Sequence, residues 1–122
     1  MCRFLATAAL IFVTLATSAS AQHIGGKYRV KGKNFDGTNY VGTVEITFQN
    51  NQSCRIVWMT GATSSQGTCM RRGRTFAAAY TLEGIVGLII YALQPDGSLE
   101  GVWTMASKPG SGSEVLTPMR GQ

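Results

Sequence analysis

The sequence predicts an all-β fold: a small eight-stranded antiparallel up-and-down meander or barrel, with a coiled two-sheet sandwich as the alternative. Three observations lead to this prediction. Between residues 27 and 117, short runs of Val, Ile, Thr, Tyr and Phe alternate with polar residues, and no segment has helical periodicity. Gly, Asn, Asp and Pro interrupt these runs at even intervals, as in consecutive hairpins. The resulting turns keep the bulky residues on one face.

We expect strands at residues 26–33, 40–49, 53–60, 64–71, 74–82, 85–94, 98–106 and 113–118. The most apolar hairpin spans residues 84–105, and Pro95-Asp96-Gly97 is its predicted turn. Pro presets φ, Asp caps the bend and Gly accepts a positive φ. This turn pairs Leu93 with Leu99, Tyr91 with Gly101 and Ile89 with Trp103.

The other turns predict further cross-strand pairs with consistent faces. Gly61-Ala62 suits a type II′ turn, whereas the loop after Asp36 needs to be longer, with Gly37 in a left-handed conformation. The predicted pairs are Phe48 with Cys54, Cys54 with Cys69, Cys69 with Phe76, Tyr80 with Gly87, and Glu45 with Lys27 or Arg29.

These registers predict the interior of the domain. The inward residues are Tyr28, Val30, Val44, Ile46, Phe48, Cys54, Ile56, Trp58, Cys69, Phe76, Tyr80, Ile89, Tyr91, Leu99, Trp103 and Met105, with Gly67, Gly87 and Gly101 among them. Glycine makes room for a ring, so Tyr80 can lie over Gly87 and Tyr91 over Gly101. Five aromatic residues could line a ligand cavity: Phe76, Tyr80, Tyr91, Trp58 and Trp103. An eight-stranded barrel is only just wide enough for its side chains, so we expect them to fill it.

Residues 1–21 have the features of a cleaved secretory signal peptide. Arg3 gives a positive start, residues 4–15 are apolar, and Ala19-Ser20-Ala21 is a small-residue cleavage site. An uncleaved membrane anchor is the alternative, but the run is short and rich in Ser, Thr and Ala. We therefore expect an exported protein, periplasmic or secreted, with one β-barrel-like domain at residues 22–122 and no transmembrane segment after signal removal.

Cleavage would remove Cys2 and leave Cys54 and Cys69. An even number of cysteines in an exported domain predicts a disulfide, with two reduced buried thiols as the alternative. The predicted register places the two residues directly opposite each other, within disulfide reach.

Several elements of the sequence resemble those of a family of small exported proteobacterial β-proteins. They are D-G-x-x-Y-x-G at 36–42, C-x-I-x-W at 54–58, G-x-C-x-R at 67–71 and G-x-W-T at 101–104, followed by the segment 112–118. Some members are labelled fibronectin-binding protein, so the resemblance implies binding to a fibronectin-like matrix protein. Gly101-Val102-Trp103 also resembles the G-x-W of lipocalin-like and avidin-like barrels, although it lies in the penultimate strand and implies no ligand.

The sequence predicts no catalytic site, metal site or cofactor. Its single histidine, His23, lies at the edge of the predicted domain, so we expect it to be frayed rather than catalytic. The six acids are isolated: Asp36 and Asp96 serve turns, Glu83 adjoins one, and Glu45, Glu100 and Glu114 fall on outward or end positions. Neither Zn²⁺ nor Ca²⁺ ligand spacing occurs, nor does a specific nucleic-acid motif.

Basic residues form two candidate sites for an acidic polymer. They are Lys27, Arg29, Lys31 and Lys33 on one outward face, and Arg71, Arg72 and Arg74 at a turn. The alternative is a solvated face in which lysines protect a strand edge.

An uncharged apolar surface is predicted on the outer side of the hairpin at residues 84–105 and of the strand before it. We call Ala77, Ala79, Val86, Leu88, Ile90 and Val102 the contact patch and expect it to mediate self-association or partner docking. The predicted function is therefore a non-enzymatic module that binds a protein or acidic polymer outside the cytoplasm. The alternative is a small-molecule carrier that uses the barrel mouth.

Overall fold

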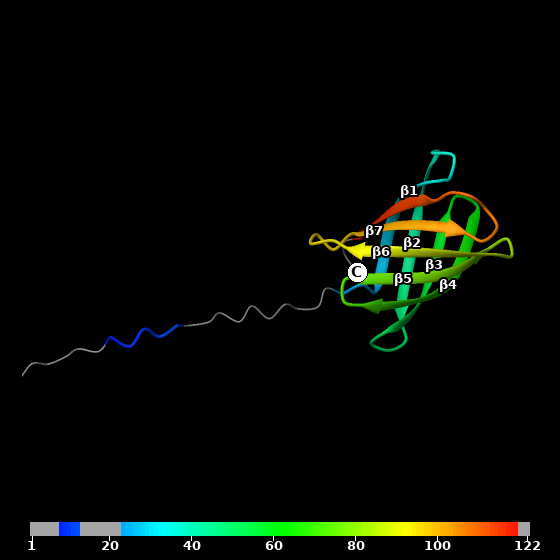
Figure 1. The fold of residues 1–122 in the computed structure, drawn as a ribbon. Coiled ribbons are helices and arrows are strands. Elements are labelled where there is room, and N and C mark those ends of the chain that lie inside the picture. The colour runs from blue at the N-terminus through cyan, green and yellow to red at the C-terminus, as the bar shows by residue number, and fades with distance from the viewer. Residues whose placement is uncertain (1–7, 13–22, 120–122) are drawn as a thin grey trace, which may run out of the picture.

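The computed structural model describes residues 8–12 and 23–119, and the second range forms a closed eight-stranded antiparallel barrel (Figure 1). Residues 8–12 are exposed and have no secondary structure. The rest of the predicted signal peptide, including its cleavage site, lies outside the described residues. The strands are β1 (Gly26–Lys33), β2 (Asn39–Phe48), β3 (Ser53–Thr60), β4 (Thr63–Arg72), β5 (Thr75–Leu82), β6 (Ile85–Leu93), β7 (Leu99–Met105) and β8 (Gly112–Pro118).

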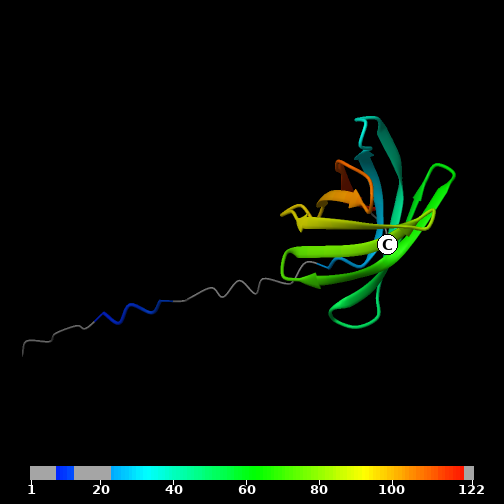
Figure 2. The ribbon, with the colours of Figure 1, turned by 45° about the vertical axis from the view of Figure 1, so that its right-hand side comes forward.

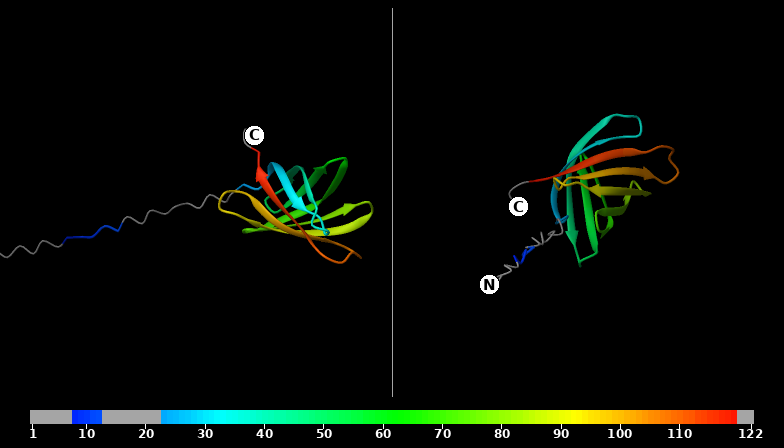
Figure 3. Two further views of the ribbon diagram at one scale, coloured as in Figure 1. Left: turned by 90° about the horizontal axis from the view of Figure 1, so that it is seen from above. Right: turned by 60° about the vertical axis from the view of Figure 1, so that its left-hand side comes forward.

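Each strand pairs with the next along the chain, and β8 closes the barrel by pairing with β1 (Figures 2 and 3). The closing ladder runs from Tyr28 opposite Pro118 to Lys33 opposite Ser113. The predicted up-and-down barrel is therefore confirmed, and the two-sheet sandwich is not formed. Because β1 has neighbours on both sides, its lysines do not protect a free strand edge.

The turn chemistry predicted most registers correctly. Cys54 lies opposite Cys69, Tyr80 opposite Gly87, and Leu93 opposite Leu99. Gly37 has φ of 83° in the β1–β2 loop, and this longer loop places Lys27 opposite Glu45. The strand bounds differ from those predicted by one residue at most.

The predicted register between β4 and β5 is wrong. Cys69 lies opposite Ala78, and Phe76 lies opposite Arg71 instead of Cys69. The turn consists of Gly73 and Arg74, because Gly73 with φ of 60° occupies its first central position. The register slips by two residues, an even number, so Phe76 still points inward.

Inward glycines make room for aromatic rings, as predicted. A Cβ atom on Gly87 would lie 2.2 Å from Cζ of Tyr80, and one on Gly101 would lie 2.6 Å from Cδ1 of Tyr91. The same arrangement recurs where Trp103 lies over Gly112, at 2.2 Å. These positions leave no room for a side chain, and the aromatic ring packs against the glycine backbone instead.

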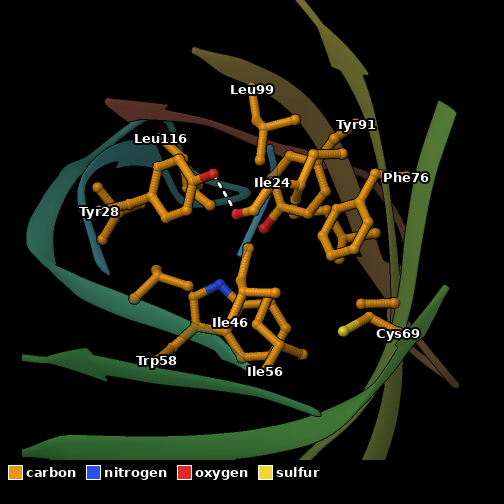
Figure 4. Close-up of a cluster of buried hydrophobic side chains, with 14 of the residues drawn as sticks. Ile24, Tyr28, Ile46, Ile56, Trp58, Cys69, Phe76, Tyr91, Leu99 and Leu116 are labelled. Carbon is orange, nitrogen blue, oxygen red and sulfur yellow. Dashed lines mark hydrogen bonds between the residues drawn. The ribbon is translucent and has the colours of Figure 1, made fainter. Parts of the chain in front are cut away.

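The barrel has two unlike ends. We call the end with the β1–β2, β3–β4, β5–β6 and β7–β8 loops the mouth end, and the opposite one the closed end. At the closed end, Ile24 precedes β1 and is 1% exposed inside the barrel. The hydroxyl of Tyr28 donates a hydrogen bond to the Ile24 carbonyl oxygen (Figure 4). Ile24 thus acts as a plug of the closed end. The side chains of Phe76, Tyr91 and Leu116 pack around it.

The predicted inward residues are buried, except that Phe48, Gly67 and Trp103 are only partly so. The predicted list lacks four apolar core residues, Ile24, Ala78, Leu93 and Leu116, although the predicted pairing with Leu99 already placed Leu93 on the inward face.

A disulfide joins β3 to β4 through Cys54 and Cys69, whose Cα atoms are 4.9 Å apart. Linking residues 15 apart in sequence stabilises the fold by about 3 kcal/mol, mainly by restricting the unfolded chain. A disulfide also indicates an oxidising environment. In the part of the chain that the structure describes, no helix is long and apolar enough to cross a membrane.

Candidate ligand-binding site

A cavity of about 460 Å³ opens at the mouth end. Trp58 and Tyr80 of the core cluster, together with Trp103, line it, whereas Phe76 and Tyr91 lie nearer the closed end and do not. We expected all five aromatic residues to fill the interior. This expectation is wrong for Trp58, Tyr80 and Trp103, which line an open cavity. The plug fills only the closed end, and inward glycines such as Gly87 contribute no side chain of their own to the space.

Aromatic rings from four strands line the cavity: Tyr40 of β2, Trp58 of β3, Tyr80 of β5 and Trp103 of β7. Trp58 and Tyr80 face each other with ring centroids 5.3 Å apart. Trp103 contacts Tyr40 edge-on at 6.3 Å and stacks with Phe35 of the β1–β2 loop at 4.8 Å. These contacts hold the rings in fixed orientations, so much of the apolar wall exists before any ligand binds.

Glu114 of β8 is the charged group among the polar residues that line this cavity, which also include Asn34 and Ser65. Its side chain is 5% exposed and faces inward, so the prediction that it occupies an outward or end position is wrong. Tyr40 donates a hydrogen bond to Oε1 over 2.6 Å. Trp58 Nε1 and the Tyr91 hydroxyl donate to Oε2 over 3.0 and 2.5 Å. Side chains from three other strands, β2, β3 and β6, thus donate to one carboxyl group of β8.

The tyrosines around Glu114 remain protonated phenols over the ordinary pH range. Burial, followed by the nearby Glu114 charge, raises the pKa of Tyr80 to about 12. The same two causes, in the same order, raise the pKa of Tyr40 and Tyr91 well above the usual range. Because an indole N–H can only donate, Trp58, Tyr40 and Tyr91 together present three hydrogens to the carboxyl group. This arrangement suits an ionised carboxylate, which only accepts.

The chemistry of the cavity favours binding over metal coordination. Among the described residues, no group of three or more His, Cys, Asp and Glu side chains could hold a metal ion. His23 lies exposed at the closed end, remote from the mouth-end cavity.

The predicted basic residues lie outside the cavity, with two strands between the two groups. Lys27, Arg29, Lys31 and Lys33 are exposed on the outer face of β1. Arg71, Arg72 and Arg74 lie at the β4–β5 turn of the closed end, where Arg71 is partly buried. Arg71 Nε donates to the Gly73 carbonyl, and Arg74 donates to the Leu93 carbonyl.

The contact patch lies on the outer faces of β5, β6 and β7, in the predicted registers. Ile90 lies between Ala77 and Val102, and Leu88 lies beside Ala79. Val86, Leu88, Ile90 and Val102 are between 52% and 63% exposed, so nothing in the described chain covers them.

Sequence reasoning missed Tyr40 and Glu114 as site residues. Alternation along β8 contains the signal, because Glu114 shares its face with Leu116, which is fully buried.

Comparison with known proteins identifies the fold but no sequence family. No family model matches the sequence, and no curated protein does. A redesigned β-barrel matches with 14% identity and a TM-score of 0.69, over 80% of this chain and 92% of that chain. The redesigned barrel mFAP1, bound to DFHBI, matches with 17% identity and a TM-score of 0.68, over 82% and 99%. A structure described as "REP1-NXSQ fatty acid transporter" matches with 11% identity and a TM-score of 0.54, over 81% and 98%.

Proposed function

We propose that this protein is an exported, non-enzymatic carrier that binds a small, largely apolar molecule in the mouth cavity. The observation that carries this proposal is a cavity of about 460 Å³ lined by aromatic rings, a few polar side chains and the buried carboxyl group of Glu114. Ligand sites typically have volumes of about 300–1,000 Å³ and combine apolar walls with a few placed polar groups.

Two further findings support this proposal: the first concerns the small ligand and the second concerns export. The barrels that match in fold include one bound to DFHBI and one described as a fatty acid transporter. The disulfide between Cys54 and Cys69 is consistent with export.

Blocking the cavity tests the proposal. Ser65 lines the mouth and is partly buried, whereas its neighbour Ser64 is exposed and lies outside the cavity. We expect the neutral fluorescent probe N-phenyl-1-naphthylamine to bind the wild type saturably, with one site per barrel. Ser65→Phe should abolish this binding and Ser64→Phe should retain it. Equal binding by both variants would place the probe elsewhere and contradict the proposal.

A second candidate function is binding of an acidic polymer or a fibronectin-like matrix protein on the outer face of β1. It is favoured by the uninterrupted row of exposed cations there. We expect heparin retention to weaken with salt and to fall in Lys31→Glu. The control is Arg55→Glu, an equal charge change on the outer face of β3. Equal retention of both variants would leave only a solvated face.

A further inference from the structure

We infer that the ligand is a small amine, with a positively charged nitrogen at Glu114 and an apolar body against the aromatic walls. The inference rests on the proposed carrier function and names the chemical class that the cavity selects. It is carried by the charge of the lining, the unused acceptor site on Glu114 and the placement of the aromatic rings.

Among the described residues, Glu114 is the only charged one that lines the cavity, and neither a lysine nor an arginine lines it. All three groups that hydrogen-bond to its carboxylate are neutral donors. Transferring an ionised group from water into a protein interior is costly unless an opposite charge accompanies it. A cationic ligand would supply that missing charge.

The carboxylate also has room for one more donor. Two carboxylate oxygens offer about four acceptor sites in all. Trp58 and Tyr91 occupy those of Oε2, and Tyr40 occupies one on Oε1. One acceptor site on Oε1 therefore remains for an N–H group of the ligand.

The aromatic walls favour the same charge. Tyr40, Trp58, Tyr80 and Trp103 all line the cavity together with Glu114. The face of an aromatic ring carries partial negative charge and attracts a cation within about 6 Å of its centre. A fatty acid carboxylate in the same place would meet Glu114 as a like charge and would lack a cationic partner.

The net charge of the protein opposes this selection only weakly. The sequence has a formal net charge of +5, and its described basic residues lie outside the cavity lining. Exposed charges are screened over about 8–10 Å at physiological ionic strength, whereas contacts inside a cavity are screened much less. The local carboxylate should therefore decide which charge is accepted.

Three probes of nearly equal size test the inference at pH 7: 2-phenylethylamine, 2-phenylethanol and phenylacetate. Binding to the intact protein is measured by calorimetry and by the fluorescence of its two tryptophans, Trp58 and Trp103, which both line the cavity. We expect the amine to bind about tenfold or more tightly than the alcohol, and phenylacetate to bind more weakly than either. In Glu114→Gln, which keeps the shape of the side chain, the amine should lose this advantage.

The ligand series on the wild type does not depend on the variant folding. Phenylacetate binding as tightly as the amine, or an amine advantage that persists in a folded Glu114→Gln variant, would overturn the inference and leave the carrier function standing. Tight binding of the alcohol alone would do the same. Binding of none of the three probes, together with no cavity binding of N-phenyl-1-naphthylamine, would overturn both proposals.

Discussion

Truncation of Ile24 is expected to destabilise the whole barrel, although this residue precedes the first strand. Ile24 is 1% exposed, whereas Ile90 on the outer face of β6 is 63% exposed. Ile24→Ala removes three buried carbon atoms, which contribute about 0.8 kcal/mol each, and leaves a cavity. We expect a loss of about 3 kcal/mol in the free energy of unfolding, and about 1 kcal/mol for Ile24→Val.

Urea denaturation followed by tryptophan fluorescence measures this loss. A domain of about 100 residues has roughly 5–15 kcal/mol of stability, so the variants should remain folded enough to compare. The melting temperature of Ile24→Ala should fall by roughly 12–24 °C. Ile90→Ala is the matched control and should cost about 1 kcal/mol or less. If Ile24→Ala costs no more than Ile90→Ala, the N-terminal segment does not close the barrel and the reasoning fails.

Three further predictions follow from burial and close contact. All four tyrosines have a raised pKa, with Tyr80 at about 12, so between pH 10 and 12 the folded chain binds more protons than the unfolded one and stability falls as pH rises. Absorbance at 295 nm should detect less tyrosinate in the native than in the urea-unfolded protein at pH 10, and equal absorbance would contradict this. Gly87→Ala places a Cβ 2.2 Å from Cζ of Tyr80 and should cost about 1–3 kcal/mol in urea denaturation; a cost that is unchanged in a Tyr80→Ala background would show that the ring is not the cause. Leu88 is 56% exposed, so Leu88→Lys should change the free energy of unfolding by less than about 0.5 kcal/mol. Any self-association through the contact patch, measured by sedimentation, should be lost, and an unfolded variant would contradict the outward placement of Leu88.

The architecture could be predicted from the sequence because local turn chemistry sets the register of every hairpin. Pro95-Asp96-Gly97 and Gly61-Ala62 each allow few alternatives, and the apolar alternation then admits one choice of face. The error at Gly73 has the same origin. A glycine can occupy either central position of a two-residue turn, and both choices keep Phe76 inside.

The candidate site could not be predicted in the same way, because its parts come together only when the barrel closes. Glu114 is separated from Tyr40, Trp58 and Tyr91 by 74, 56 and 23 residues. A glutamate near the end of a short strand resembles a solvated residue until those three donors are placed around it. The cavity remains open because Ile24 fills only the closed end. The alternation of residues along the strands does not predict that Ile24, which precedes β1, is buried inside the barrel.

The first and last residues of the described barrel segment, His23 and Met119, lie at the closed end. Ile24 fills the closed end, and the backbone N–H of Met119 donates to the Lys27 carbonyl oxygen over 3.0 Å, which fixes the C-terminal strand beside the N-terminal one. Both ends of this segment therefore lie opposite the opening of the cavity (Figure 3). A fusion partner joined directly before His23 or directly after Met119 would start away from the opening, so immobilised protein should keep its capacity for ligand. An insertion in the β7–β8 loop would instead lie at the mouth end, beside the opening of the cavity.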